Sequence, residues 1–196
     1  MTNVSTVLAR ATQMVGRHTV YWAGAGGFDP LAPTPAQPLA IGQKWPGLSA
    51  AEQAQLRPMA EAAGLDVDDP QLVAPACDCS GFVCWAMGIA RNPAPGRWIN
   101  TDSIWEDATG RGAQFRQIER AAPGCLVVYP KEGSGETYGH VALVTEVAND
   151  GRAARIVHCS AKNFSAAPAD AIKITTARVF EDQGKSIYAW FRPMTP

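Results

Sequence analysis

Five β-rich runs near the C-terminus constrain the fold of this chain more than any other feature. They are rich in Val, Ile and aromatic residues, which favour strands, and turn residues separate them, notably those at 149–151. The runs are GCLVVYP (124–130), GHVALVTEV (139–147), RIVHCS (155–160), AIKITTARVF (171–180) and SIYAWFR (186–192). Such short connections favour an antiparallel sheet in this part of the chain.

Helical patterns come before these runs. Apolar residues recur at helical spacing from Val4 to Val15, Asn3 or Thr2 can cap the helix, and Gly16 ends it. A further helix is predicted over 79–88, and a short capped helix or a turn over 100–110. Helices followed by a meander of strands predict an α+β domain, with N-terminal helices packed on a five- to six-stranded antiparallel sheet. The length of 196 residues suits one domain over 1–196.

An insertion interrupts this pattern at about 28–76. Eight of the fifteen prolines lie there, which sets its composition apart from the rest of the chain. Ser49 and Glu52 have the spacing of a capping box, so a helix is predicted from Ala50. Pro58 is expected to kink or divide that helix, and Gly64 to close it.

Composition excludes several classes of partner. The net charge of −1 gives no electrostatic reason to expect nucleic acid or an anionic membrane. No run reaches the roughly 18 to 20 apolar residues that a membrane span needs. The N-terminus lacks the basic and apolar blocks of a signal peptide, so synthesis in the cytoplasm without a leader is expected. An odd number of cysteines, five, favours mainly reduced thiols.

Three of the cysteines crowd into residues 77–84, and four interpretations compete: a metal site, a disulfide, core packing and a nucleophile. Cys77 and Cys79 are one residue apart with no second pair, which disfavours zinc, and no metal or cofactor is predicted. Cys84, Cys125 and Cys159 lie in apolar runs and are expected to be buried. Cys79 instead begins a helix, where unpaired N–H groups should lower its pKa and favour the nucleophilic thiolate.

Two of the three histidines fall on neighbouring predicted strands. His140 begins one strand and His158 ends the next, with a hairpin turn at 149–151 between them. That turn pairs Ala148 with Arg152 and puts the two histidine Cβ atoms within about 5 to 8 Å. Beside a helix-start cysteine they supply a base and an orienting group. A surface or packing role is expected for His18.

Several segments together resemble NlpC-type cysteine peptidases, which are papain-like enzymes that cut the peptide stems of bacterial peptidoglycan. The segments, in chain order, are ARATQMVGRHTVYWAGAGG, DCSGFVCWAMGI, RWINTDSIW, APGCLVVYP, YGHVALVTEV and RIVHCS. The resemblance implies Cys79 as nucleophile, His140 as base and His158 as the third polar residue. It also implies that Tyr21, Asp78 and Ser80 line the site and help to hold the free amine of a stem peptide. Cys125 stands where the family usually has Asp, and a structural substitution is expected there.

The resemblance further implies the reaction and its setting. The expected activity is a cysteine endopeptidase that cuts between γ-D-glutamate and the diamino acid of peptidoglycan. An acyltransferase, an amidase acting between sugar and stem peptide, and an inactive cell-wall-binding module remain alternatives. Action in the periplasm or cell wall is expected after type VI secretion or phage lysis, and a toxin effector of this kind would need an immunity protein.

Overall fold

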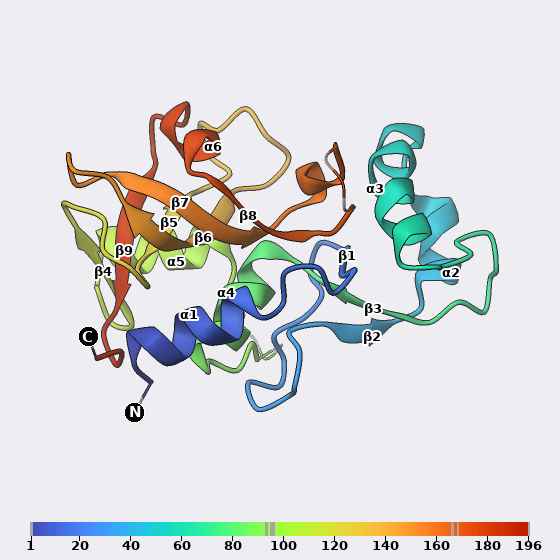
Figure 1. Cartoon of the computed structure of the whole chain (residues 1–196), viewed down its shortest axis with the longest axis horizontal. Helices are drawn as coiled ribbons and strands as arrows, with labels where there is room; N and C mark the ends of the chain where they lie inside the picture. Colours follow the sequence, from blue (N-terminus) through green and yellow to red (C-terminus); the bar gives the residue numbers. More distant parts are fainter. Residues whose placement is uncertain (1, 93, 95–96, 166, 168, 196) are drawn as a thin grey trace.

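A six-stranded antiparallel sheet forms the centre of the computed structural model, which describes residues 2–92, 94, 97–165, 167 and 169–195 (Figure 1). Its strand order is β4-β9-β5-β6-β7-β8. The strands are β4 (Phe115–Ile118), β5 (Leu126–Tyr129), β6 (His140–Val147), β7 (Ala153–Cys159), β8 (Ile172–Thr176) and β9 (Ile187–Phe191). This confirms the predicted α+β class; the run 171–180 is strand only to Thr176, because α6 (Arg178–Glu181) follows it.

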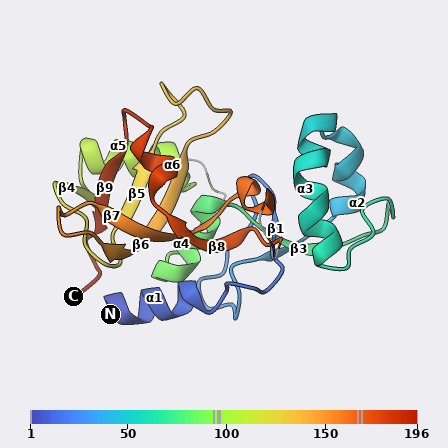
Figure 2. The ribbon, with the colours of Figure 1, turned by 45° about the horizontal axis from the view of Figure 1, so that its top comes forward.

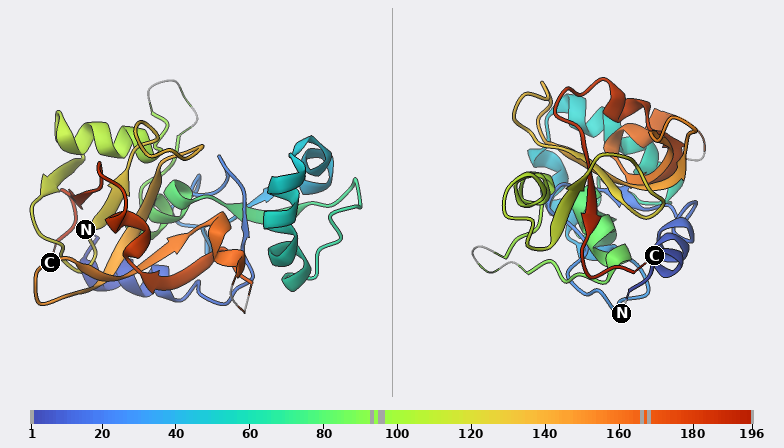
Figure 3. Two further views of the ribbon diagram at one scale, coloured as in Figure 1. Left: turned by 90° about the horizontal axis from the view of Figure 1, so that it is seen from above. Right: turned by 90° about the vertical axis from the view of Figure 1, so that its left-hand side faces the viewer.

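Three helices pack on one face of this sheet: α1 (Val4–Thr12), α4 (Cys79–Met87) and α5 (Thr101–Thr109). Every residue of α4 is buried, since the helix lies between α1 and strands β6 and β7. The short α6 covers the other face of the sheet (Figure 3). Its residue Phe180 joins a second apolar cluster there. Helix α1 is capped by Asn3 but ends before the expected Gly16, because turns already begin after Thr12.

A small second sheet, absent from the sequence-based prediction, holds the start of α4. It contains β1 (Val20–Tyr21), β2 (Gln37–Leu39) and β3 (Ala74–Cys77) in the order β1-β3-β2. Strand β3 pairs with β1 in parallel and with β2 antiparallel. Because β3 runs directly into Asp78 and Cys79, pairing with β1 places the predicted nucleophile beside Tyr21.

The proline-rich segment forms a helical unit at one end of the molecule (Figures 1 and 2). It contains α2 (Ile41–Lys44), the 3₁₀ helix η1 (Trp45–Gly47) and α3 (Ala50–Ala62). Leu39 pairs with Ala74, so the two ends of this unit meet. Its apolar cluster around Trp45 also includes Val20 and Ala25 from the segment before it. The Ser49–Glu52 capping box is present as predicted.

Pro58 lies inside α3 without dividing it, which corrects the expected break. The helix keeps Leu56, Met59 and Ala60 buried on one face. This packing keeps the helix continuous although Pro58 has no N–H for the helical hydrogen bond. Among the described residues, no helix has the length and apolar character needed to cross a membrane.

Candidate active site

The carboxylate of Asp78 anchors the start of α4. Its Oδ1 accepts hydrogen bonds from the Gly81 N–H at 2.6 Å and from the Ser80 hydroxyl at 3.1 Å, so it is the N-cap of the helix. The Oδ2 atom accepts from the Gly24 N–H at 2.7 Å. Arg91 completes the group with two contacts, Nη1 to Oδ1 at 2.8 Å and Nη2 to Oδ2 at 3.0 Å. Four partners thus fix this carboxylate in place.

Arg91 is a member of the site that the sequence did not indicate. Its side chain is buried beneath Trp98, with the guanidinium 4.0 Å from the ring centroid. It neutralises the charge of Asp78 and also binds the Ser80 hydroxyl at 3.0 Å. A free amine would therefore meet a carboxylate that is already paired. These contacts support an anchoring role for Asp78 and Ser80, and their predicted contact with a substrate amine stays a prediction.

Cys79 occupies the first position of α4 and is 5% exposed. Burial, followed by the charge of Asp78, raises the pKa of its thiol to about 12. The backbone N–H groups of Val141 and Ser80 favour the thiolate but do not outweigh the burial. The pKa expected from its helix-start position was therefore wrong in direction. The contact with Val141 brings this sulfur to the backbone of β6, one residue after His140.

His140 and His158 meet across the β6–β7 hairpin. His140 Nε2 lies 2.7 Å from His158 Nδ1, and the ring centroids are 5.0 Å apart. The hairpin has the predicted register: the Ala148 N–H donates to the Arg152 carbonyl at 2.8 Å, and Leu143 pairs with Val157. The sequence thus predicted the closeness of the two rings through the turn at 149–151.

The protein surrounding the histidine pair keeps it neutral. The His140 ring stacks on Phe180, with 5.4 Å between centroids, and lies 6.3 Å from the ring of Tyr129 on the neighbouring strand. Burial, followed by the neighbouring His158, lowers the pKa of His140 well below 6.5. Burial also lowers the pKa of His158 to about 4. Because His158 occupies Nε2 of His140, the Nδ1 atom is the one left to receive a proton.

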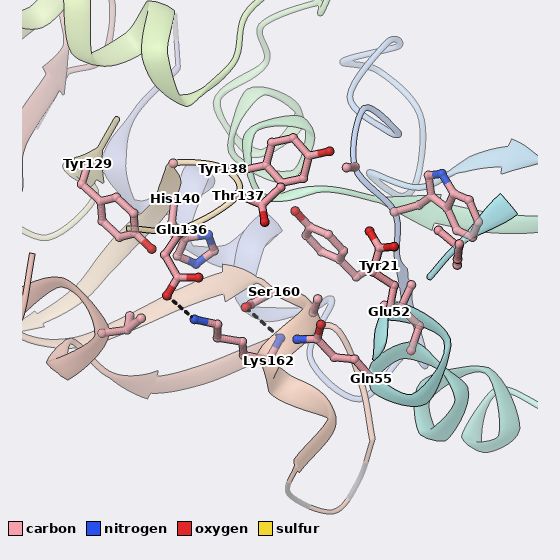
Figure 4. Close-up of a pocket in the computed structure, with 17 residues that line it drawn as sticks. Tyr21, Glu52, Gln55, Tyr129, Glu136, Thr137, Tyr138, His140, Ser160 and Lys162 are labelled. Atoms are coloured by element: carbon pink, nitrogen blue, oxygen red, sulfur yellow. Dashed lines mark hydrogen bonds and ion pairs between the residues drawn. The ribbon is translucent and has the colours of Figure 1, made fainter. Parts of the chain in front are cut away.

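Two cavities adjoin these residues and share a wall. His140 lines a cavity of about 350 Å³, and Cys79 lines another of about 320 Å³. Tyr21 and Tyr138 line both, and their rings lie next to each other in the close-up (Figure 4). Burial, followed by the nearby Cys79, raises the pKa of Tyr21, so its phenol stays protonated. Tyr21 therefore lies at the predicted site and offers a hydroxyl donor there, while its contact with substrate stays a prediction.

The helical insertion supplies one wall of the larger cavity. Its residues Leu48, Glu52, Gln55 and Leu56 line that wall. Gln55 extends from α3 toward the segment that carries Ser160 and Lys162 (Figure 4). On the far side Lys162 Nζ and Glu136 Oε1 form an ion pair at 2.6 Å (Figure 4). The sequence did not indicate these wall residues, because their approach depends on how the two parts of the chain fold together.

The remaining cysteines and His18 lie outside this arrangement of reactive groups. All five cysteines are free and buried, and Cys84 and Cys159 lie in the apolar interior. Cys125 joins the apolar cluster beneath α6, as a structural substitution would. His18 is exposed, and its backbone N–H donates to Asp170 Oδ2 at 3.1 Å.

The fold and the site together define a papain-like arrangement, with a cysteine at the start of a buried helix and histidines on an adjacent antiparallel sheet. The model of the CHAP domain matches residues 70–163. This part of the chain is thus similar to the CHAP domain, which is part of the papain-like amidase and peptidase superfamily related to NlpC/P60 proteins. No curated protein matches the sequence.

The CHAP match bears on the general class of reaction. It implies a peptidoglycan hydrolase, either an amidase or a peptidase, with Cys–His catalysis. The matched range includes Cys79, His140 and His158 as well as Asp78 and Ser80. It leaves out Tyr21 and nearly all of the helical insertion, so the assignments in those parts rest on the structure and the NlpC resemblance.

Proposed function

We propose that this protein is a cysteine endopeptidase of peptidoglycan stem peptides, with Cys79 as nucleophile, His140 as base and His158 as orienting residue. The observation that carries the proposal is the 2.7 Å contact between His140 Nε2 and His158 Nδ1. That contact leaves Nδ1 of His140 available for the thiol of Cys79, whose sulfur meets the backbone of Val141, the next residue along β6. A nucleophile, a base and an orienting group are the minimum for this chemistry.

The reaction begins from neutral partners, because burial keeps the thiol protonated and the histidines uncharged. As Cys79 Sγ attacks the amide carbon, His140 accepts the thiol proton. The carbonyl oxygen becomes an oxyanion near the N–H groups of the first helical turn, which have no partner within the helix. His140 then gives its proton to the leaving amine. Water hydrolyses the thioester, which releases the carboxylic acid and restores the thiol.

The bond between γ-D-glutamate and the diamino acid is the proposed site of cleavage, supported by the resemblance to NlpC-type peptidases. An amidase that separates the sugar from the stem peptide is the second candidate. It is favoured by the CHAP match, since that superfamily contains amidases as well as peptidases. The same three residues serve either reaction, so the products decide between them.

The test is a digest of purified Gram-negative peptidoglycan with the wild-type protein and with Cys79→Ala, read by mass spectrometry. Cys84→Ala serves as a matched control, because Cys84 is also a buried thiol of α4. Fragments split between D-glutamate and diaminopimelate, seen with the wild type and the control only, are expected. Free stem peptides with intact γ-glutamyl bonds would select the amidase. Identical fragments from Cys79→Ala would overturn the assignment of the nucleophile.

The place of action follows from the proposed substrate. Because peptidoglycan lies outside the cytoplasmic membrane, action in the periplasm or cell wall is part of the proposal. A route by type VI secretion or phage lysis, and an immunity or inhibitor protein that plugs the cleft, stay predictions from the sequence. A pull-down with Cys79→Ala from the producing cell, followed by inhibition of the digest, tests for such an inhibitor.

A further inference from the structure

Thr175 contacts the side of His158 that faces away from His140. Its Oγ1 lies 3.1 Å from His158 Nε2 and 3.1 Å from the Thr176 carbonyl oxygen. Thr175 lies on β8, opposite Ile156 and two residues from the position that pairs with His158. The two ring nitrogens of His158 thus have different partners, Thr175 at Nε2 and His140 at Nδ1.

The Thr176 carbonyl decides the direction of these hydrogen bonds. The Thr175 hydroxyl donates its single proton to this carbonyl oxygen, which can only accept. The Thr175 oxygen is then an acceptor toward His158, and Nε2 of His158 carries the hydrogen. A neutral imidazole has one N–H, so Nδ1 of His158 is bare and accepts from His140 Nε2–H.

We propose that Thr175 is a positioning residue that sets the proton on His140 through His158. With its hydrogen on Nε2, His140 presents a bare Nδ1, which is the form that can accept the thiol proton of Cys79. The reverse orientation of the Thr175 hydroxyl would put hydrogens on Nδ1 of both histidines. In that form His140 could not act as the base, so a single hydroxyl on β8 selects the competent tautomer.

Burial of the pair supports this assignment. His140 and His158 are 8% and 4% exposed, so water does not readily replace the hydroxyl as a partner. Burial also lowers the pKa of both rings, so each is neutral and has a tautomer to select. When His140 takes up the thiol proton, bare Nδ1 of His158 stays as the acceptor that stabilises the imidazolium. This role rests on the proposed function, but the tautomer itself does not.

The direct test is the ¹⁵N NMR spectrum of the histidine rings in the resting wild-type protein and in Thr175→Val. Valine keeps the branched shape and removes the hydroxyl. In the wild type, the ¹⁵N shifts are expected to show a protonated Nε2 and a bare Nδ1 on both His140 and His158. In Thr175→Val, a mixture of tautomers is expected. A bare Nε2 on His158 of the wild type would overturn the proposal, whether or not the protein cuts peptidoglycan.

The kinetic test compares Thr175→Val with Thr175→Ser, which restores the hydroxyl. A loss in kcat of about 10- to 100-fold is expected for valine, with KM changed less than about 2-fold and most of the rate recovered by serine. Thr12→Val is the matched control, since the Thr12 hydroxyl donates to the α1 carbonyls of Leu8 and Ala9. An unchanged kcat in a folded Thr175→Val would overturn the role. If valine prevents folding, the wild-type spectrum and the serine variant still decide it.

Discussion

Asp78 and Arg91 form a buried ion pair directly before the cysteine at the start of α4, with 2.8 Å between Oδ1 and Nη1. Their side chains are 7% and 1% exposed. Asp78 also caps the helix, and Arg91 also binds the carbonyls of Ala25, Gly26 and Ile99. The pair therefore joins the end of the small sheet, the segment of Ala25 and Gly26, and the helix that carries Cys79.

Replacing Arg91 by Met should destabilise the protein more than any exposed charge does. Asp78 would keep a buried charge without its partner, so a loss of about 3 to 5 kcal/mol in the free energy of unfolding is expected. Urea denaturation measures it. Arg57→Met is the matched control, because its pair with Asp68 is exposed, and a change under about 1 kcal/mol is expected there. Equal effects of the two substitutions would contradict this account.

Alkylation of Cys79 by iodoacetamide should accelerate continuously from pH 7 to pH 10. Burial raises the pKa of this thiol to about 12, so the thiolate fraction keeps growing across that range. Mass spectrometry of the peptide that carries Cys79 gives the rate at each pH. The same cysteine in urea-unfolded protein is the control, and its rate should level off near the ordinary thiol pKa of about 8.5. A plateau below pH 7 in the folded protein would instead reveal a resting thiolate.

The geometry of the site was predictable only where it rests on local sequence signals. The turn at 149–151 fixed the register of two strands, and that register set the distance between His140 and His158. Asp78 before Cys79 similarly marked a helix start. Both features depend on residues that are close together in the sequence, so local sequence patterns predict them.

The environment of the site could not be predicted in this way. Arg91 contacts Asp78 from beyond the C-terminus of α4, and Thr175 contacts His158 from the neighbouring strand β8. No sequence motif marks either residue. The pKa of Cys79 followed the same rule: the helix start favours the thiolate, but burial by distant segments outweighs it. Short β1 and β2, of two and three residues, were likewise too small to give a periodic signal.

Stability should fall as the pH drops from 6.5 toward 4, in part through His158. Its pKa is about 4 when folded and about 6.5 when unfolded, so the unfolded chain binds a proton that the folded chain does not. The contribution of His158 to the free energy of unfolding is fully present above pH 6.5 and is lost on acidification. The loss is on the order of 3 kcal/mol. Urea unfolding of the wild type and of His158→Asn at several pH values isolates it. Parallel pH dependences would show that His158 does not contribute.

Gln55 should affect substrate binding more than the chemical step. It projects from α3 into the cavity that His140 lines, on the wall opposite the Glu136–Lys162 pair (Figure 4). Gln55→Ala should raise KM for stem-peptide substrates about 3- to 10-fold and leave kcat within about 2-fold, since the lost contact is uniform between ground and transition states. Glu61→Ala is the control, because this exposed α3 residue is outside the cavity lining. If kcat falls while KM holds, the insertion takes part in organising the catalytic residues and is more than a wall for the substrate.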